Sequence, residues 1–373
     1  MIIKDELYGT IECSELEKRI IDSQEFQRLH RIKQMAFTYL VYPSATHTRF
    51  EHSLGTMHLA STMAQRLCYV GESLAKIRLF ALLHDIGHVA FSHESEYVLK
   101  HYLGDHEEIG KKKIMNGELA DLLKENFSPK NILDIEHTTE GKIITSDLGA
   151  DRMDYLMRDA RNTGVAYGIV DVDRIIHTLS LEGNELAIEE SSLTAAESLL
   201  IARFMMFTTV YLHRAVRIAA VMLRKAISLA IENKAIAPED FLSAGDEEIL
   251  LKMRASNNKY TDALMKRNLY KEVYSLEPNE NIKKNLKKIE SELSERLRCD
   301  ILIDYPTYFF KPVDFKVKTK DGLKSIIELA EIVRSLEISE QRRKRVLVLC
   351  EEKFRDKSKG RIKSEIENIN CDF

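Results

Sequence analysis

An apolar run in the first quarter of the chain leads directly into a cluster of histidines. Residues 81–93 read Ala-Leu-Leu-His84-Asp85-Ile-Gly87-His88-Val-Ala-Phe-Ser-His93, directly after more apolar sequence. A helix buried through residues 79–83 would carry His84 and Asp85 into a region of low dielectric constant. An unpaired carboxylate is costly there. The stretch therefore predicts a compensating cation or metal ion beside Asp85.

The spacing within this stretch also predicts how its side chains lie. His84 and His88 are four residues apart, which places them on one face if the helix continues. Gly87 lacks a side chain, so that another segment can approach the backbone there. A metal site built on His84 and Asp85 needs two more donors from elsewhere. The alternative is a pair of satisfied core histidines beside a carboxylate at a helix end.

Candidate partners for this stretch occur on both sides of it. His52 follows Arg49 by three residues at the start of an apolar helix, so that both side chains face the same way. Glu96 and His106 follow His93, and His106 begins a charged helix. A polar stripe at helical spacing (i, i+4, i+7 and i+8) is formed by Asp151, Tyr155, Arg158 and Asp159.

The composition indicates an ample core and a highly charged surface. The 373 residues are 44% apolar and 31% charged, and the formal net charge of −4 argues against a general nucleic-acid binder. No uncharged apolar run reaches the length of a membrane span, and the first residues do not resemble a signal peptide. We therefore expect a cytoplasmic protein without a membrane partner.

The cysteines argue for reduced thiols. None has CxxC spacing, which argues against a zinc ribbon or a disulfide framework. No glycine-rich loop of the P-loop or dinucleotide-binding kind is present either. Any handling of nucleotides must then rest on a metal ion and side chains. The five cysteines are Cys13, Cys68, Cys299, Cys350 and Cys371.

Helical periodicity dominates the first 270 residues. A capping box at Ser14–Glu17 predicts a helix start, and residues 193–231 predict one long apolar helical stretch. Two short hairpins are predicted, at residues 1–13 and, with a Gly-Asn turn, at residues 181–190.

The pattern changes after residue 270. A charged helix is expected at residues 283–298 and an amphipathic helix at residues 323–336. Strands are expected at residues 301–305, 315–319 and 345–350. We predict a mainly α fold, with a helical domain of residues 1–270 and a smaller α+β C-terminal subdomain of residues 271–373.

The ordered set His52, His84-Asp85 and Asp151 resembles the H…HD…D pattern of the HD-domain metal-dependent phosphohydrolases. Longer phrases resemble the deoxynucleoside triphosphate triphosphohydrolase (dNTPase) branch, which includes the animal SAM-and-HD-domain enzyme. The resemblance covers about residues 1–225 and implies a helical HD core at about residues 48–160. The phrases are Phe26-Gln-Arg-Leu-His-Arg-Ile-Lys-Gln34, Thr48-Arg-Phe-Glu-His-Ser-Leu-Gly55, residues 83–93 and Asp151-Arg-Met-Asp-Tyr155.

The resemblance implies roles for particular residues. One divalent metal ion (Mg, Mn, Fe, Ni or Zn) would be held by His52, His84, Asp85 and Asp151. Catalysis would use His93, His106 and Glu96. Substrate would be bound by Gln34, Arg49, His88, Tyr155 and Asp159, with Arg49 on phosphate and Gln34, Tyr155 and Asp159 on deoxyribose. The implied reaction cleaves at the α-phosphorus and releases intact triphosphate, with a protonated histidine assisting the leaving 5′-oxygen.

Three positions depart from the dNTPase pattern. His30 stands where the animal enzyme has an arginine that reads guanine in its regulatory site. Thr209 replaces a phosphate-binding arginine, and Arg217 replaces a base-stacking tyrosine. These departures leave the base preference, the need for a triphosphate and a nucleotide-activated site open.

Three functions are consistent with these residues. The first is hydrolysis of dNTPs by a homo-oligomer, and the second is HD-type hydrolysis of nucleoside monophosphates or cyclic nucleotides. The third is a nucleotide-sensing or nucleic-acid-binding protein with a structural metal ion. Retention of Arg49, His93, His106 and Glu96 favours an enzyme, because a structural site needs ligands but no acid or base. A nucleotide partner is expected, and a nucleic-acid partner is not.

Overall fold

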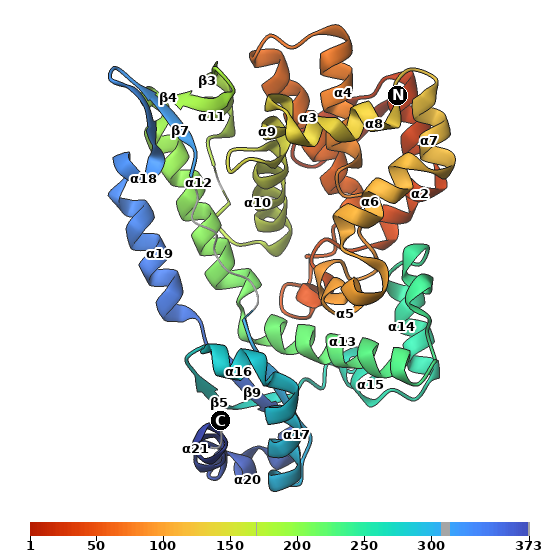
Figure 1. Ribbon diagram of the computed structural model, residues 1–373, viewed down its shortest axis with the longest axis vertical. Coiled ribbons are helices and arrows are strands. Elements are labelled where there is room, and N and C mark those ends of the chain that lie inside the picture. The colour runs from red at the N-terminus through yellow and green to blue at the C-terminus, as the bar shows by residue number, and fades with distance from the viewer. Residues whose placement is uncertain (169, 307–313, 372–373) are drawn as a thin grey trace.

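A computed structural model describes residues 1–168, 170–306 and 314–371, and helices make up most of it (Figure 1). The mainly α prediction is confirmed. The region before residue 180 contains β1 (Ile2–Asp5), β2 (Gly9–Glu12), α1 (Glu15–Ile21), α2 (Gln24–Gln27), η1 (Arg28–Arg31), η2 (Ala36–Leu40), α3 (Arg49–Arg66), α4 (Gly71–Leu83), α5 (His93–Leu103), α6 (His106–Met115), α7 (Gly117–Lys124), α8 (Pro129–Leu133), η3 (Asp134–His137), α9 (Thr139–Thr145), α10 (Ala150–Thr163), α11 (Val172–His177) and the start of β3 (Leu179–Glu182).

The rest of the chain adds more helices and short strands. Its elements are β4 (Glu185–Glu189), η4 (Glu190–Ser192), α12 (Leu193–Met206), η5 (Phe207–Tyr211), α13 (Arg214–Glu232), η6 (Pro238–Leu242), α14 (Asp246–Ala255), α15 (Lys259–Met265), β5 (Lys271–Leu276), α16 (Glu280–Lys284), α17 (Leu286–Leu297), β6 (Ile301–Asp304), β7 (Lys316–Thr319), β8 (Gly322–Ser325), α18 (Ile326–Leu329), α19 (Glu331–Arg343), β9 (Val346–Cys350), η7 (Glu352–Phe354), α20 (Arg355–Lys359) and α21 (Ile362–Cys371).

Local sequence signals set several of these boundaries. The Ser14 hydroxyl accepts the Glu17 amide, and the Glu17 carboxylate accepts the Ser14 amide at 2.8 Å, so the predicted capping box begins α1. The predicted hairpins at both places are confirmed as β1–β2 and β3–β4. Gly183 takes a φ of +63° in the second turn, a conformation that glycine adopts without strain.

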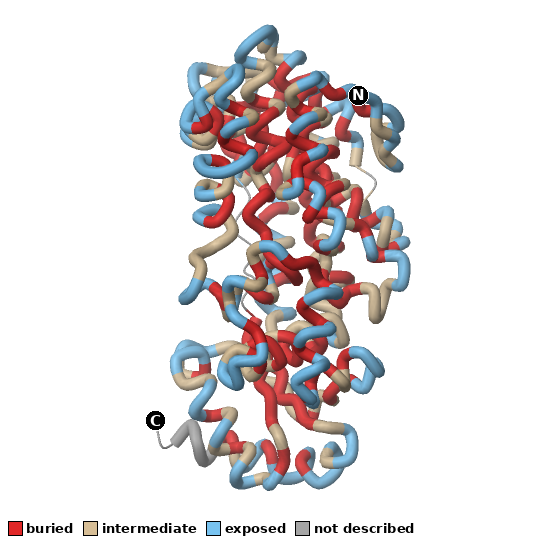
Figure 2. Tube along the Cα trace, turned by 90° about the vertical axis from the view of Figure 1, so that its right-hand side faces the viewer, coloured by how far each residue is buried: buried red, intermediate tan, exposed pale blue. Residues whose placement is uncertain are grey.

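The helical core forms around α3, which packs against α4 and α10. Buried residues run through the middle of this region (Figure 2). The side chains of Leu54, Met57 and Leu82 belong to one buried apolar cluster. Because both partners of α3 are packed against it, the ends of three helices are fixed relative to one another, and the candidate site lies at those ends.

The long apolar helical stretch predicted at residues 193–231 consists of two helices. A π-helical turn, η5, ends α12, and α13 starts only at Arg214. Such turns often occur at functional sites, and this one directs Phe207 and Tyr211 into a cavity. The segment Glu190–Tyr211 is also long and apolar enough to cross a membrane by length and composition alone, with 44% of its most apolar window buried. Part of that burial comes from packing against α19.

The C-terminal region forms two separate structures. β5, β9 and β6 make an antiparallel sheet in the order β5-β9-β6, which contacts α13 through β6. Residues 314–343 instead return to the far end of the molecule, where β7 pairs in parallel with β4 and α19 packs on α12 (Figure 1). The predicted helix at residues 323–336 is wrong at its start. Residues 323–325 belong to β8, and the first helix of this region begins at Ile326. The proposed boundary near residue 270 stays a prediction.

The thiols agree with the prediction for the part of the chain that is described. Cys13, Cys68, Cys299 and Cys350 are free, and the side chain of Cys371 lies outside the described residues.

Candidate active site

A cavity of about 400 Å³ lies between the end of α4, the start of α10 and the middle of α13. It brings together ten of the twelve residues predicted for the site, and the other two, His84 and Glu96, contact members of this set. The ten residues that line it are Gln34, Arg49, His52, Asp85, His88, His93, His106, Asp151, Tyr155 and Asp159.

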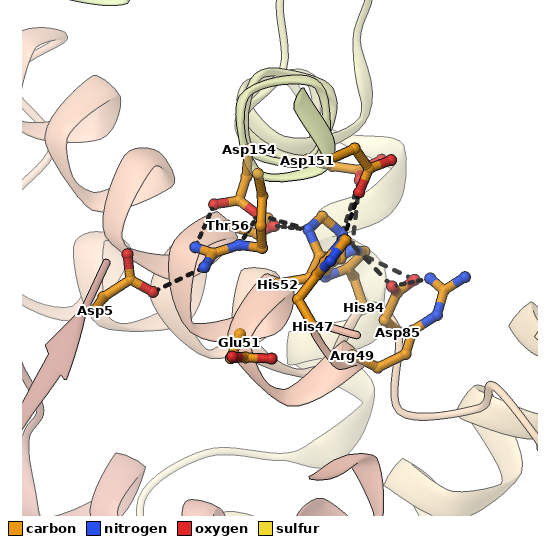
Figure 3. Close-up of polar contacts among 12 residues, drawn as sticks. Asp5, His47, Arg49, Glu51, His52, Thr56, His84, Asp85, Asp151 and Asp154 are labelled. Carbon is orange, nitrogen blue, oxygen red and sulfur yellow. Dashed lines mark hydrogen bonds and ion pairs between the residues drawn. The ribbon is translucent and has the colours of Figure 1, made fainter. Parts of the chain in front are cut away.

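The four predicted metal ligands converge from three helices. His52 projects from α3, His84 and Asp85 follow the last residue of α4, and Asp151 lies in the first turn of α10. His52 Nε2 lies 3.1 Å from Asp151 Oδ1 and 3.5 Å from Asp85 Oδ2. His84 Nε2 lies 3.4 Å from Asp85 Oδ1 and 3.8 Å from Asp151 Oδ1. Figure 3 shows the four side chains turned toward a common point.

The other nitrogen of each histidine is fixed by an acceptor behind it. His52 Nδ1 lies 2.8 Å from Asp154 Oδ2, and His84 Nδ1 lies 2.7 Å from the Ala81 carbonyl oxygen. With a proton on Nδ1, each ring turns an Nε2 lone pair toward the two carboxylates. His84 Nε2 is buried and has no hydrogen-bond partner in the described part of the chain. This is how outer groups orient histidine ligands, so the residues fit a divalent metal ion.

Asp154 is itself held by a buried network (Figure 3). Arg158 donates to both oxygens of Asp154 at 2.9 Å and to Asp5 of the N-terminal hairpin at 3.0 Å. The Tyr8 hydroxyl donates to Asp154 Oδ1 at 2.8 Å. The stripe of Asp151, Tyr155, Arg158 and Asp159 lies on one continuous helix as predicted, but Arg158 is not among the residues that line the cavity.

Arg49 contacts the metal ligands in this structure. Its Nη1 lies 2.5 Å from Asp85 Oδ2, and its Nε donates to Ser92 Oγ at 3.0 Å. Burial opposes ionisation of Asp85, but the charges of His84 and Arg49 hold the pKa of this carboxyl well below its ordinary value. The Arg49 guanidinium thus places a positive charge beside Asp85, on the wall of the cavity, as expected for a phosphate clamp.

A second cluster adjoins the four ligands. His106 Nδ1 lies 2.8 Å from Glu96 Oε2, and His93 Nδ1 lies 3.5 Å from the same oxygen. The ring of His88 stacks on that of His106 with centroids 4.1 Å apart, and His88 Nε2 lies 3.3 Å from Asp85 Oδ1. The three histidines therefore connect Glu96 to the metal ligands.

The protonation of this cluster follows from its contacts. Burial lowers the pKa of His106, but the hydrogen bond with Glu96 outweighs it and leaves that pKa above its ordinary value. Burial and the charge of Arg49 hold the pKa of His88 well below its ordinary value. Within one cluster, the contacts therefore favour the protonated form of His106 and the neutral form of His88.

The backbone of the predicted HD stretch differs from the prediction. α4 ends at Leu83, so His84 and His88 do not share a helical face. The Gly87 prediction is confirmed: a side-chain carbon on Gly87 would lie 1.9 Å from the His106 carbonyl oxygen and 2.4 Å from the Gly110 amide nitrogen. The absence of a side chain there lets α6 approach, and α6 carries His106 at its first position.

The residues predicted to hold the sugar, Gln34, Tyr155 and Asp159, all line the cavity and are called its sugar end. Asp159 Oδ1 lies 2.7 Å from His47 Nε2, and its Oδ2 accepts the Tyr211 hydroxyl at 2.7 Å. The Gln34 backbone N–H donates to the His47 carbonyl oxygen. The side-chain Oε1 of Gln34 is buried without a partner among the described residues. A ligand hydroxyl would satisfy this oxygen.

Apolar side chains form the remaining wall. Phe91 stacks on Phe37 with ring centroids 5.6 Å apart. The apolar residues of the wall are Met35, Ala36, Phe37, Phe91, Phe207, Val216, Ala220 and Leu223.

Several residues of the site were not predicted. Asp154 lies inside a phrase that carries the family resemblance and His47 directly precedes another, so each had a positional signal. Tyr211 enters the cavity through the π-helical turn, for which the apolar pattern gives no sign. Of the three departures, Arg217 forms an ion pair with Asp304 at 2.5 Å, and the Thr209 carbonyl oxygen accepts the Tyr42 hydroxyl.

The fold and the site define an HD-type metal-dependent phosphohydrolase. Residues 49–159 match the HD domain, and residues 170–370 match the HD associated region. The chain belongs to the HD-domain phosphohydrolase superfamily.

Three similar proteins illustrate the match. An uncharacterized protein of Methanocaldococcus jannaschii, MJ1154, is 38% identical over 99% of this chain and 83% of its own length. A phosphohydrolase of known structure from Bacteroides thetaiotaomicron superposes with a TM-score of 0.77, at 25% identity over 94% of this chain and all of that one. The deoxynucleoside triphosphate triphosphohydrolase SAMHD1 homolog of Dictyostelium discoideum is 26% identical over 72% of this chain, which spans 59% of that protein.

Proposed function

We propose that this protein hydrolyses deoxynucleoside triphosphates to the deoxynucleoside and inorganic triphosphate. The observation that carries the proposal is Gln34 Oε1, which is buried without a partner among the described residues, in the cavity that Tyr155 and Asp159 also line. A buried acceptor without a partner is costly, so the site favours a ligand that brings a hydroxyl there. A deoxyribose bound there would have its 5′-phosphate toward the metal ligands. Similarity to the Dictyostelium relative supports the same substrate class.

Each group of residues in the cavity has a role in this reaction. A divalent ion held by His52, His84, Asp85 and Asp151 would supply Lewis-acid polarisation of a phosphate oxygen. Arg49 already directs its guanidinium at Asp85 and can clamp an adjacent phosphate through its other donors.

The leaving oxygen needs a proton, because an alkoxide is a poor leaving group at neutral pH. His93 lines the cavity beside Glu96 and provides that proton, while His106 holds the Glu96 carboxylate in place. The apolar wall formed by residues such as Phe37 and Leu223 accepts the base without reading its polar edge.

A second candidate substrate is a nucleoside monophosphate or a cyclic nucleotide. Among the described residues that line the cavity, Arg49 is the only arginine or lysine, and it already faces Asp85. Thr209 cannot supply the charge of the arginine found at this position in the dNTPase pattern. A single phosphate needs less positive charge than a triphosphate.

Product analysis distinguishes the two candidates. Protein loaded separately with Mg²⁺, Mn²⁺ or Zn²⁺ would be incubated with dNTPs, NTPs, nucleoside monophosphates and cyclic nucleotides, and every product identified. Deoxynucleoside with intact triphosphate supports the proposal. Release of single phosphates, or turnover of monophosphates or cyclic nucleotides alone, contradicts it and favours the second candidate. The Asp85→Ala variant is the control for contaminating phosphatases.

A further inference from the structure

Asp246 is a buried carboxylate that belongs to none of the groups described above. It is the first residue of α14 and is 2% exposed. Its Oδ1 accepts the Phe91 amide at 2.7 Å, and its Oδ2 accepts the Lys33 amide at 3.0 Å. One side chain therefore holds two backbone segments that are 58 residues apart in sequence (91 − 33).

Both segments lead directly into the candidate active site. Lys33 precedes Gln34 at the sugar end of the cavity. Phe91 lies two residues before His93, with Ser92 between them as the acceptor for Arg49 Nε. The carboxylate of Asp246 thus links the backbone segment next to Gln34, whose side chain is proposed to bind the sugar, to the segment next to His93, the proposed proton donor.

The segment at Phe91 needs an external support. Phe91 has a φ of 62° and Ser92 a φ of 50°, in the left-handed region that residues with side chains rarely adopt. Such a conformation persists only where surrounding contacts require it. The hydrogen bond from the Phe91 amide to Asp246 is one of these contacts, and α5, with His93 at its first position, begins directly after the strained pair.

The position of Asp246 is set by close packing. Gly245 precedes it, and a side-chain carbon there would lie 2.4 Å from Arg31 Cβ. The start of α14 can therefore lie directly against the segment that contains Lys33. A carboxylate at a helix start is favourable, and its two acceptor oxygens match the two N–H groups that it meets.

We propose that Asp246 is a positioning residue that fixes the segment of His93 relative to the segment of Gln34. The proposal rests on the proposed function for the roles of those two residues. The contact itself involves neither the metal ligands nor the substrate. Loss of Asp246 should therefore reduce turnover and leave metal binding unchanged.

The test uses Asp246→Asn, with Glu247→Gln as the matched control. An amide has one acceptor oxygen, and its NH₂ group would face one of the two N–H donors. Glu247 adjoins Asp246 in the same helical turn and pairs with Lys33 Nζ at 3.0 Å, but within the described residues its carboxylate accepts no backbone N–H of either segment. Both variants remove one negative charge from the start of α14.

Two measurements on metal-replete protein decide the proposal. Hydrogen exchange should become faster at residues 30–36 and 86–95 in Asp246→Asn but not in Glu247→Gln, with residues 54–64 of α3 as the internal reference. The kcat of Asp246→Asn should fall by about 10²-fold, as expected for a misplaced catalytic group, with unchanged metal stoichiometry.

Unchanged exchange at both segments would overturn the proposal, and so would faster exchange with a kcat equal to that of Glu247→Gln. Exchange is measured without substrate. If the wild-type protein turns over no nucleotide in the product analysis, the proposed function fails, and the effect of Asp246 on turnover fails with it. The exchange data alone then decide whether Asp246 holds the two backbone segments, and unchanged exchange overturns that part too.

Discussion

His52 turns its two ring nitrogens toward different carboxylates: Nδ1 lies 2.8 Å from Asp154, and Nε2 lies 3.1 Å from Asp151. Asp154 thus orients the ring of His52, one of the four predicted metal ligands. We expect Asp154→Asn to weaken metal affinity by about 10- to 100-fold, the usual cost of losing such a support. Titration of the metal-free protein with Mn²⁺ measures the change. Asp173→Asn, an exposed carboxylate on α11, is the control, and equal affinity in both variants would contradict the prediction.

Two ligand substitutions test the metal centre directly. Asp85→Ala and Asp151→Ala each remove one of the two carboxylates between His52 and His84. We expect both variants to lose bound metal and activity, because each keeps only three of the four donors and one of the two charged oxygen ligands. Metal analysis by mass spectrometry, together with circular dichroism to confirm folding, checks this result. Unchanged stoichiometry in both folded variants would eliminate the site.

His93 should matter for turnover rather than for metal. It lies in the cavity but outside the four ligands, so His93→Ala should keep the metal and nucleotide binding while kcat falls by about 10²–10⁴-fold. His101→Ala, an exposed histidine on the same helix, is the control. Steady-state rates, metal content and thermal melting on one preparation separate catalysis from stability. Near-normal kcat with normal metal would leave His106 as the acid.

The contact between Glu96 and His106 predicts a pH dependence. The Glu96 hydrogen bond holds the pKa of His106 above its ordinary value, so His106 stays protonated as the pH rises past about 6.5. The contribution of the Glu96–His106 contact to the free energy of unfolding is complete below that pH, and it is lost as the pH rises through the raised pKa of His106. In Glu96→Gln the pKa of His106 should fall, and NMR titration of the His106 ring across pH 5–9 measures this change. An unmoved His106 titration in the folded variant would contradict the prediction.

We also propose that the protein is a homo-oligomer. One large apolar side chain stays exposed on each of α12 and α19 among the described residues, namely Ile201 at 37% and Ile338 at 53% exposure. Light scattering at micromolar concentration should give a mass that is a multiple of 43.0 kDa. A monomer mass both with and without nucleotide would refute the proposal.

The residues of the metal centre could be predicted because they are close to motifs in the sequence. His84 and Asp85 are adjacent, and burial of the preceding apolar run already required a counter-charge. The backbone around them could not be predicted in the same way. Four-residue spacing implies a shared face only in a helix, and α4 ends one residue before His84. The convergence of these side chains on one point depends on the packing of α3, α4 and α10.

The contributions from distant segments had no local signal. Asp246 lies among acidic residues at a helix start, where a solvated carboxylate is the ordinary expectation, and only the close approach at Gly245 buries it. Tyr211 reaches Asp159 because the helix changes to a π-helical turn, which the apolar periodicity does not encode. In both cases the missing information was tertiary contact rather than residue type.

The parallel pairing of β4 with β7 has a consequence for synthesis of the chain. Ala187 is opposite Lys316, which the ribosome adds 129 residues later (316 − 187). At translation rates of about 5–20 residues per second, β4 is paired with β3 but lacks β7 on its other edge for roughly 6–26 s. Throughout that interval the nascent chain presents an unpaired strand edge, which is a template for association with another chain. A chaperone that covers the free edge of β4 would be most useful during that interval.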